Sequence, residues 1–248
     1  MDENIDGMID RTLKALKARD FEATLAKDRV EACNLILDLI PGSVTVCVGD
    51  SSTIRQTQVV KALRDRATAV INPFDPDKKI EDERTFFEFL FRPSLDASLG
   101  DVFLTGTNAI TEDGKLLNID GAGNRVAGMF WGHPLSIIVV GRNKIVKDLD
   151  EALDRIRKVI APTHFRLRCE LGGKKRETPC VATGKCTDCR SVDRGCNVFT
   201  IIEGKPNQTN LNVILVNQDL GLGWDPAWPE ERIEKIRESY RKFVWVPV

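Results

Sequence analysis

The sequence lacks several features that would assign it to a common class of protein. None of its apolar runs is long enough to cross a bilayer, and the N-terminus, MDENIDGMID, is acidic where a secretory signal peptide would be basic and then apolar. The 36 Lys and Arg residues are balanced by 37 Asp and Glu residues, so no basic field favours nucleic acid. These absences predict a cytoplasmic protein with no membrane span and no nucleic-acid partner.

Common catalytic motifs are absent as well. The sequence contains no Rossmann GxGxxG motif and no Walker lysine motif, and nothing in it indicates a flavin or nicotinamide site. Only two histidines are present, His133 and His164, and their spacing supports no Ser-His-Asp or Cys-His pairing. His133 could be a base or a ligand, but a single histidine beside a proline in a loop is more often structural.

What is present is an alternation of strand-like and helix-like segments, which is typical of a mostly parallel sheet flanked by helices. Hydrophobic spacing predicts helices over residues 5–16, 28–40, 54–64 and 148–160, the last ended by Pro162, with a further helix opened by Pro229. Strands are predicted over residues 43–49, 67–71, 101–104, 137–140, 197–203 and 211–216. Phenylalanines over residues 86–91 indicate core or an interface.

This pattern predicts an N-terminal helical segment (1–42), an α/β domain (43–222) that includes a Cys-rich loop (165–196), and a C-terminal helix and tail (223–248). The two N-terminal helices could cap the domain or form the contact of a homodimer, and the sequence does not choose between these roles.

The stretch from Leu104 to Val146 is rich in glycine and in short polar side chains. A polar connection of this kind between buried strands is where an α/β protein usually keeps its site. Tight turns such as Glu112-Asp113-Gly114 explain the glycines but not the density of polar residues. We therefore expect a ligand site formed by Thr105, Gly106, Thr107, Asn108, Asp120, Gly121, Gly123, Asn124 and Arg125. Arg125 is expected to bind a carboxylate or phosphate directly.

A second polar loop, Asp50-Ser51-Ser52-Thr53, follows the predicted strand 43–49 and precedes a predicted helix. Free backbone N–H groups at such a junction can bind an anion. The alternative is an ordinary helix N-cap by Ser51, Ser52 or Thr53. Because loops at the carboxyl ends of strands converge in an open α/β sheet, this loop and the Gly-rich stretch are expected to share one site for a small anionic ligand.

The residues TGTNAITEDGKLLNIDGAGNRVA, followed by VVGRNKIV, resemble the LUD (lactate-utilization) domain family. The resemblance extends weakly over residues 44–222. It implies a fold similar to that of ribose-5-phosphate isomerase and the CoA-transferases, and a role in lactate utilization. It also invites comparison of Glu112 with the Glu-x-Gly nucleophile segment of CoA-transferases, although a plain turn carboxylate is the alternative.

Seven cysteines are unusual for a cytoplasmic chain, and four of them, Cys180, Cys186, Cys189 and Cys196, form the pattern C-x5-C-x2-C-x6-C. Such clustering indicates metal or redox chemistry. A 4Fe–4S cluster tolerates irregular short spacing, whereas structural zinc normally uses two separated CxxC pairs, so iron–sulfur is favoured over zinc and over unligated thiols. The pattern resembles a cysteine-bearing branch of the LUD family.

Two functions follow from these predictions. In the first, the protein is a cytoplasmic component of an iron–sulfur-dependent lactate oxidation system and works with iron–sulfur partner subunits in electron transfer. In the second, it is a stand-alone enzyme or sensor that binds a CoA ester or sugar phosphate, and its metal is a purely structural zinc.

Overall fold

The computed structural model describes residues 2–76, 87–173 and 175–246 of the chain. Six of the described strands form a parallel sheet in the order β1-β10-β7-β4-β2-β3. Their bounds are β1 Glu22–Ala26, β2 Thr45–Val48, β3 Ala69–Ile71, β4 Val102–Gly106, β7 Leu135–Gly141 and β10 Asn210–Val216. The predicted α/β class with a mostly parallel sheet is confirmed.

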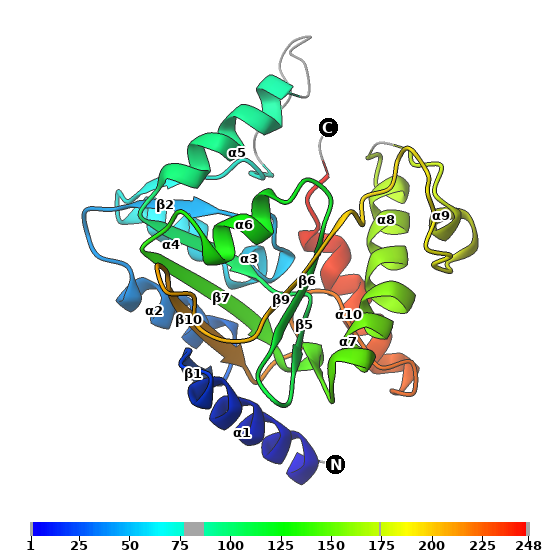
Figure 1. Ribbon diagram of the computed structural model, residues 1–248, viewed down its shortest axis with the longest axis horizontal. Helices are drawn as coiled ribbons and strands as arrows, with labels where there is room; N and C mark the ends of the chain where they lie inside the picture. Colours follow the sequence, from blue (N-terminus) through cyan, green and yellow to red (C-terminus); the bar gives the residue numbers. More distant parts are fainter. Residues whose placement is uncertain (1, 77–86, 174, 247–248) are drawn as a thin grey trace.

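A second, four-stranded sheet has the order β8-β5-β6-β9. Its strands are β5 Ala109–Thr111, β6 Leu116–Asp120, β8 Ile145–Val146 and β9 Val198–Ile202. It crosses in front of the parallel sheet in Figure 1. The hairpin predicted at Glu112-Asp113-Gly114 joins β5 to β6, and Gly114 has the positive φ of 86° that the turn requires.

Both faces of the parallel sheet are covered. Alternate residues of one strand point to opposite faces, so Leu104 joins an apolar cluster with α2 (Arg29–Leu39) and α4 (Val59–Asp65). Phe103 joins the opposite cluster, which contains residues of the second sheet, α1 (Asp2–Ala18) and α6 (Asn124–Phe130). The outer face of the second sheet packs against α7 (Leu149–Arg155) and α10 (Glu230–Phe243) in a third cluster.

The N-terminal segment contains the two predicted helices and one element that was not predicted. Strand β1 lies at the edge of the parallel sheet and pairs with β10 along its whole length. Its sequence, EATLA, is too short and too mixed in polarity to be recognised as a strand. Residues 1–42 therefore contribute to the main sheet as well as covering it.

Pro162 does not end the helix that contains it, contrary to the sequence prediction. After α7 the chain continues through a π-helical turn (Ile156–Ile160) into α8 (Ala161–Glu170). Pro162 follows directly on this π-helical turn, at the start of α8. The continuous rod extends past the edge of the second sheet, and α8 faces the carboxyl ends of the parallel strands (Figure 1).

The remaining elements are short. They are α3 Ser52–Thr57, the π-helical turn Phe87–Phe91, α5 Arg92–Asp96, the 3-10 turns Ala97–Leu99 and Arg142–Lys144, and α9 Pro179–Thr183. The helix predicted over 54–64 is interrupted at Gln58, which has a φ of 60°. The aromatic prediction over 86–91 lies partly outside the described residues. Among the helices that the structure describes, none combines the length and apolar character that a membrane span requires.

Candidate functional site

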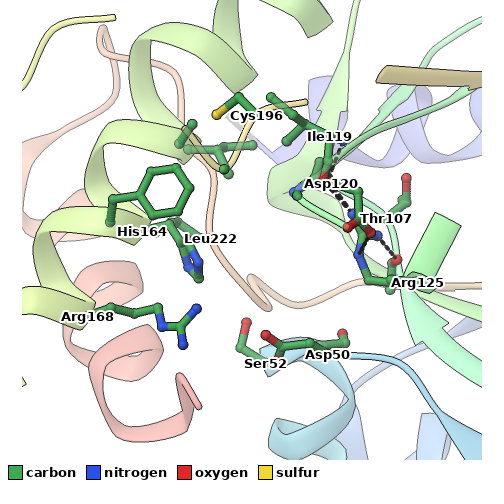
Figure 2. A pocket seen from close by; sticks show the side chains of 18 of the residues that line it. Asp50, Ser52, Thr107, Ile119, Asp120, Arg125, His164, Arg168, Cys196 and Leu222 are labelled. Carbon is green, nitrogen blue, oxygen red and sulfur yellow. Dashed lines mark hydrogen bonds and ion pairs between the residues drawn. The ribbon is translucent and has the colours of Figure 1, made fainter. Parts of the chain in front are cut away.

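A cavity of about 240 Å³ lies at the carboxyl ends of β2 and β4. One wall is formed by residues from the three segments that the sequence analysis expects to converge: Asp50, Ser51, Ser52, Gly106, Thr107, Asn108, Asp120, Gly121, Asn124 and Arg125. Figure 2 shows Arg168 and His164 of α8 facing this wall from the other side. The predicted groups are therefore close to one another in space.

The predicted residues Thr53, Thr105 and Gly123 do not line the cavity. Thr53 is buried behind it and accepts a hydrogen bond from Lys144. Thr105 is fully buried, and its hydroxyl has no hydrogen-bond partner in the described structure. Ser51 caps α3 by accepting a bond from the backbone N–H of Ile54, as the alternative interpretation of this loop expects.

Arg125 lines the cavity, but its donors are already occupied. Its Nη1 donates to the carbonyl of Gly106 (3.1 Å) and to Oδ1 of Asn118 (2.8 Å). Its Nη2 donates to Oδ1 of Asn108 (3.0 Å) and to the carbonyl of Ile119 (2.8 Å).

The remaining nitrogen of Arg125, Nε, faces Asp120 at 3.6 Å. The four terminal N–H groups thus bind protein acceptors, and none is left for a bidentate contact with an anion. In this structure Arg125 ties the end of β4 to β6 and contacts Asn108 and Asp120, and direct ligand binding by Arg125 stays a prediction.

Glu112 does not line this cavity. It lies in the turn between β5 and β6, where its carboxylate accepts a hydrogen bond from Nε of Arg11 at 2.9 Å and is 2.8 Å from Nη2. This arrangement is that of a turn carboxylate held by α1. The comparison with a CoA-transferase nucleophile implies that Glu112 lies in the site. In the structure Glu112 lies at the turn before β6, whereas the cavity is lined by Asp120 at the other end of β6.

Lys144 is a site residue that the sequence analysis missed. It ends the 3-10 turn after β7, is 6% exposed and lines the cavity. Its Nζ donates to Oγ1 of Thr53 (3.0 Å) and to the carbonyl of Thr107 (2.8 Å). Burial, together with the nearby charge of Arg125, lowers its pKa to about 7. The motif VVGRNKIV contained this lysine, but nothing in its local pattern indicated burial.

Helix α8 provides the residues that face the predicted wall, and the premature end predicted at Pro162 hid them. Nδ1 of His164 forms a hydrogen bond of 2.5 Å with the hydroxyl of Tyr240, and burial lowers the pKa of His164 to about 3. Asp50 is paired with Arg55 at 2.8 Å, and despite its burial the charges of Arg55 and Arg168 keep its carboxyl pKa below the usual value.

Arg168 differs from the other arginines of the cavity. Its guanidinium lies 5.4 Å from the ring of Trp245 and has no hydrogen-bond partner among the described residues. Burial lowers its pKa, while Asp50 raises it. In Figure 2 the guanidinium points across the cavity toward Ser52. Arg168 is therefore a charged donor group that the protein itself leaves available.

The four clustered cysteines line a second, smaller cavity of about 30 Å³. Cys196 also lines the main cavity, so the two spaces are adjacent. Burial, and then the neighbouring cysteines, raise the pKa of the Cys196 thiol to about 11. However, the described residues contain no group of three or more His, Cys, Asp or Glu side chains that could hold a metal ion.

The site and fold can be compared with known proteins. No curated protein matches the chain. Among solved structures, a DUF162 family protein from Deinococcus radiodurans is 14% identical with a TM-score of 0.49, over 86% of this chain and 98% of that one. The model of the LUD domain matches residues 9–216. Because this match spans most of the chain, the protein belongs to the LUD domain family, which supports a role related to lactate utilization.

Proposed function

We propose that the cavity binds a small organic anion and that this binding is the protein's contribution to lactate utilization. The observation that supports the proposal is the guanidinium of Arg168, which faces the cavity without a hydrogen-bond partner in the described chain. A carboxylate or phosphate can accept two parallel N–H bonds from such a group. Arg168 is half-buried at the cavity wall, so an anionic ligand in the cavity would meet a guanidinium with free N–H donors.

The opposite wall offers further groups to the same ligand. The Oδ1 atom of Asn108 accepts from Ile119 and Arg125, whereas its amide Nδ2 has no bond to any described residue. Arg125 therefore orients Asn108 with its amide donor available to the cavity. Ser52 lies across the cavity from Arg168 (Figure 2). A ligand with a carboxylate at one end and a hydroxyl or carbonyl at the other would meet donors at both ends.

The volume and the apolar lining limit the ligand's size. Ile160, Leu222 and Phe165 contribute apolar surface between the polar walls. Pockets for drug-sized molecules usually span about 300–1,000 Å³. A cavity of about 240 Å³ thus suits a molecule of a few heavy atoms, and it is too small to enclose a whole CoA ester.

Isothermal titration calorimetry with L-lactate, pyruvate and inorganic phosphate tests the proposal. We expect at least one of them to bind, and Arg168→Ala to weaken that binding roughly tenfold or more, because a hydrogen bond to a charged group contributes about 1.5–3 kcal/mol. The matched control is Arg166→Ala on the exposed side of the same helix. Equal affinities for wild type and Arg168→Ala, or no binding by any of the three anions, would refute the proposal.

A second candidate function is electron transfer through a metal centre at Cys180, Cys186, Cys189 and Cys196, and the position of Cys196 between the two cavities favours it. Metal and sulfide analysis of anaerobically purified protein distinguishes a 4Fe–4S cluster from a zinc ion. Cys186→Ser should lower the metal content, and Cys33→Ser, outside the cluster of four cysteines, is the control. Iron together with sulfide supports electron transfer, whereas zinc supports a structural role. If the protein contains no iron and no zinc, this second candidate function is excluded.

A further inference from the structure

We infer that Lys144 is a nucleophile that binds a carbonyl compound covalently, as an imine, when that compound also carries the anionic group held by Arg168. This inference rests on the proposed function, since it takes the anion-binding cavity as given and adds the chemistry of the bound molecule. It names the substrate class as small 2-oxo acids or phosphorylated aldehydes and ketones.

The hydrogen bonds of Lys144 suit a neutral amine. A neutral amine has two N–H groups and one lone pair, and the protein supplies two acceptors, Oγ1 of Thr53 and the carbonyl of Thr107. Donation to both would leave the lone pair free. No salt bridge or hydrogen bond joins Lys144 to a carboxylate in the described structure, so no ion pair holds it in the charged form.

The backbone of Gly221 packs closely against the amine of Lys144. Gly221 has a φ of 71° and passes so close to Lys144 that a Cβ there would lie 2.6 Å from Nζ. A side chain at this position would displace the amine. Lys144 itself is only 6% exposed, and it lines the cavity. A small ligand in the cavity can therefore reach Nζ, whereas bulk solvent has little access to it.

Burial of Lys144 and the positive charge of Arg125 both favour the neutral amine near neutral pH. Desolvation disfavours the ammonium, and Arg125 adds repulsion. Desolvated lysines with a lowered pKa are the usual nucleophiles in imine-forming sites. Arg125, with its own donors bound to protein acceptors, thus contributes charge to the site without contacting the ligand.

The reaction balances without an oxidant or a reductant. The lone pair of Nζ attacks the carbonyl carbon, a C–N bond forms, and the carbonyl oxygen takes a proton. The nitrogen then loses its protons as the C–O bond breaks, so one molecule of water leaves and a C=N bond remains. Both protons of the neutral amine leave in that water, so the step needs no further proton acceptor from the protein.

Reductive trapping tests the inference. Wild-type protein is incubated at neutral pH with sodium cyanoborohydride and either pyruvate or dihydroxyacetone phosphate, and the adduct is located by peptide mass spectrometry. We expect one adduct per chain, on Lys144, with at least one of the two compounds. The two probes distinguish a carboxylate from a phosphate as the anionic group.

The controls separate a site from surface chemistry. Lys147→Arg, at an exposed lysine three residues away, should leave the adduct unchanged, and Lys144→Arg should abolish it. If Lys144→Arg does not fold, excess inorganic phosphate or L-lactate should suppress the wild-type adduct instead. An adduct spread over exposed lysines would overturn the inference about Lys144. So would the absence of any adduct while calorimetry still shows anion binding, and in both cases the proposed function would stand. Loss of both binding and adduct would overturn the proposed function.

Discussion

The substitution Arg125→Ala tests whether this arginine supports the fold, as the structure indicates, or binds the ligand, as its sequence suggests. It removes four hydrogen bonds of 2.8–3.1 Å and a 3.6 Å ion pair from a side chain that is only 11% exposed. The carbonyls of Gly106 and Ile119 would each lose this donor, and Asp120 would lose its counter-charge. The acceptor atoms of Asn108 and Asn118 would each keep one backbone partner.

The magnitude follows from the burial of these groups. Removal of one partner from a buried ion pair usually costs about 3–5 kcal/mol. For a chain of this size each kcal/mol lowers the melting temperature by about 2–4 °C, so a fall of roughly 6–20 °C is expected. Arg125→Lys should recover less than half of the loss, because an ammonium restores the charge but not the fork of parallel donors.

Urea unfolding followed by circular dichroism measures this free energy directly. Arg166→Ala is the control, and as an exposed position it should change stability by no more than about 0.5 kcal/mol. A loss below about 1 kcal/mol for Arg125→Ala, accompanied by complete loss of anion binding, would refute the reasoning and return Arg125 to the ligand.

Three further predictions concern other parts of the chain. Glu112→Gln should leave anion affinity unchanged and cost less than about 1 kcal/mol in urea unfolding, because its pair with Arg11 is partly exposed; a loss of binding would contradict its placement outside the site. The pKa of His164 is lowered from 6.5 to about 3, so the unfolded chain binds the extra proton in this window and stability should fall as pH decreases from 6.5 to 3; His164→Phe should flatten this part of the stability curve, and an unchanged slope would exclude the residue. Gly128→Ala should destabilise the protein by about 1–3 kcal/mol in thermal unfolding, because the new Cβ would lie 2.6 Å from the ring of Phe103; wild-type stability would show that the ring can move aside.

The amino-acid sequence was sufficient to predict the class of the fold. The apolar runs Val102–Leu104 and Ile137–Val140 are continuous because both faces of their sheet are covered, and such runs mark buried parallel strands. Polar segments that follow two of these strands must lie at their carboxyl ends, so the meeting of Asp50–Ser52 with Gly106–Asn108 could be expected. Local spacing also placed the hairpin turn at Gly114.

The tertiary structure alone decided what each polar residue is free to do. Arg125 has its acceptors on strands β4 and β6 and on the loop before β5, and Lys144 contacts Thr53, which is 91 residues away. Arg168 reaches the cavity only because a π-helical turn lets the helix continue through Pro162. Hydrophobic periodicity reports local structure, whereas burial and the identity of hydrogen-bond partners depend on contacts between distant segments, and these contacts determine which charged groups remain available to a ligand.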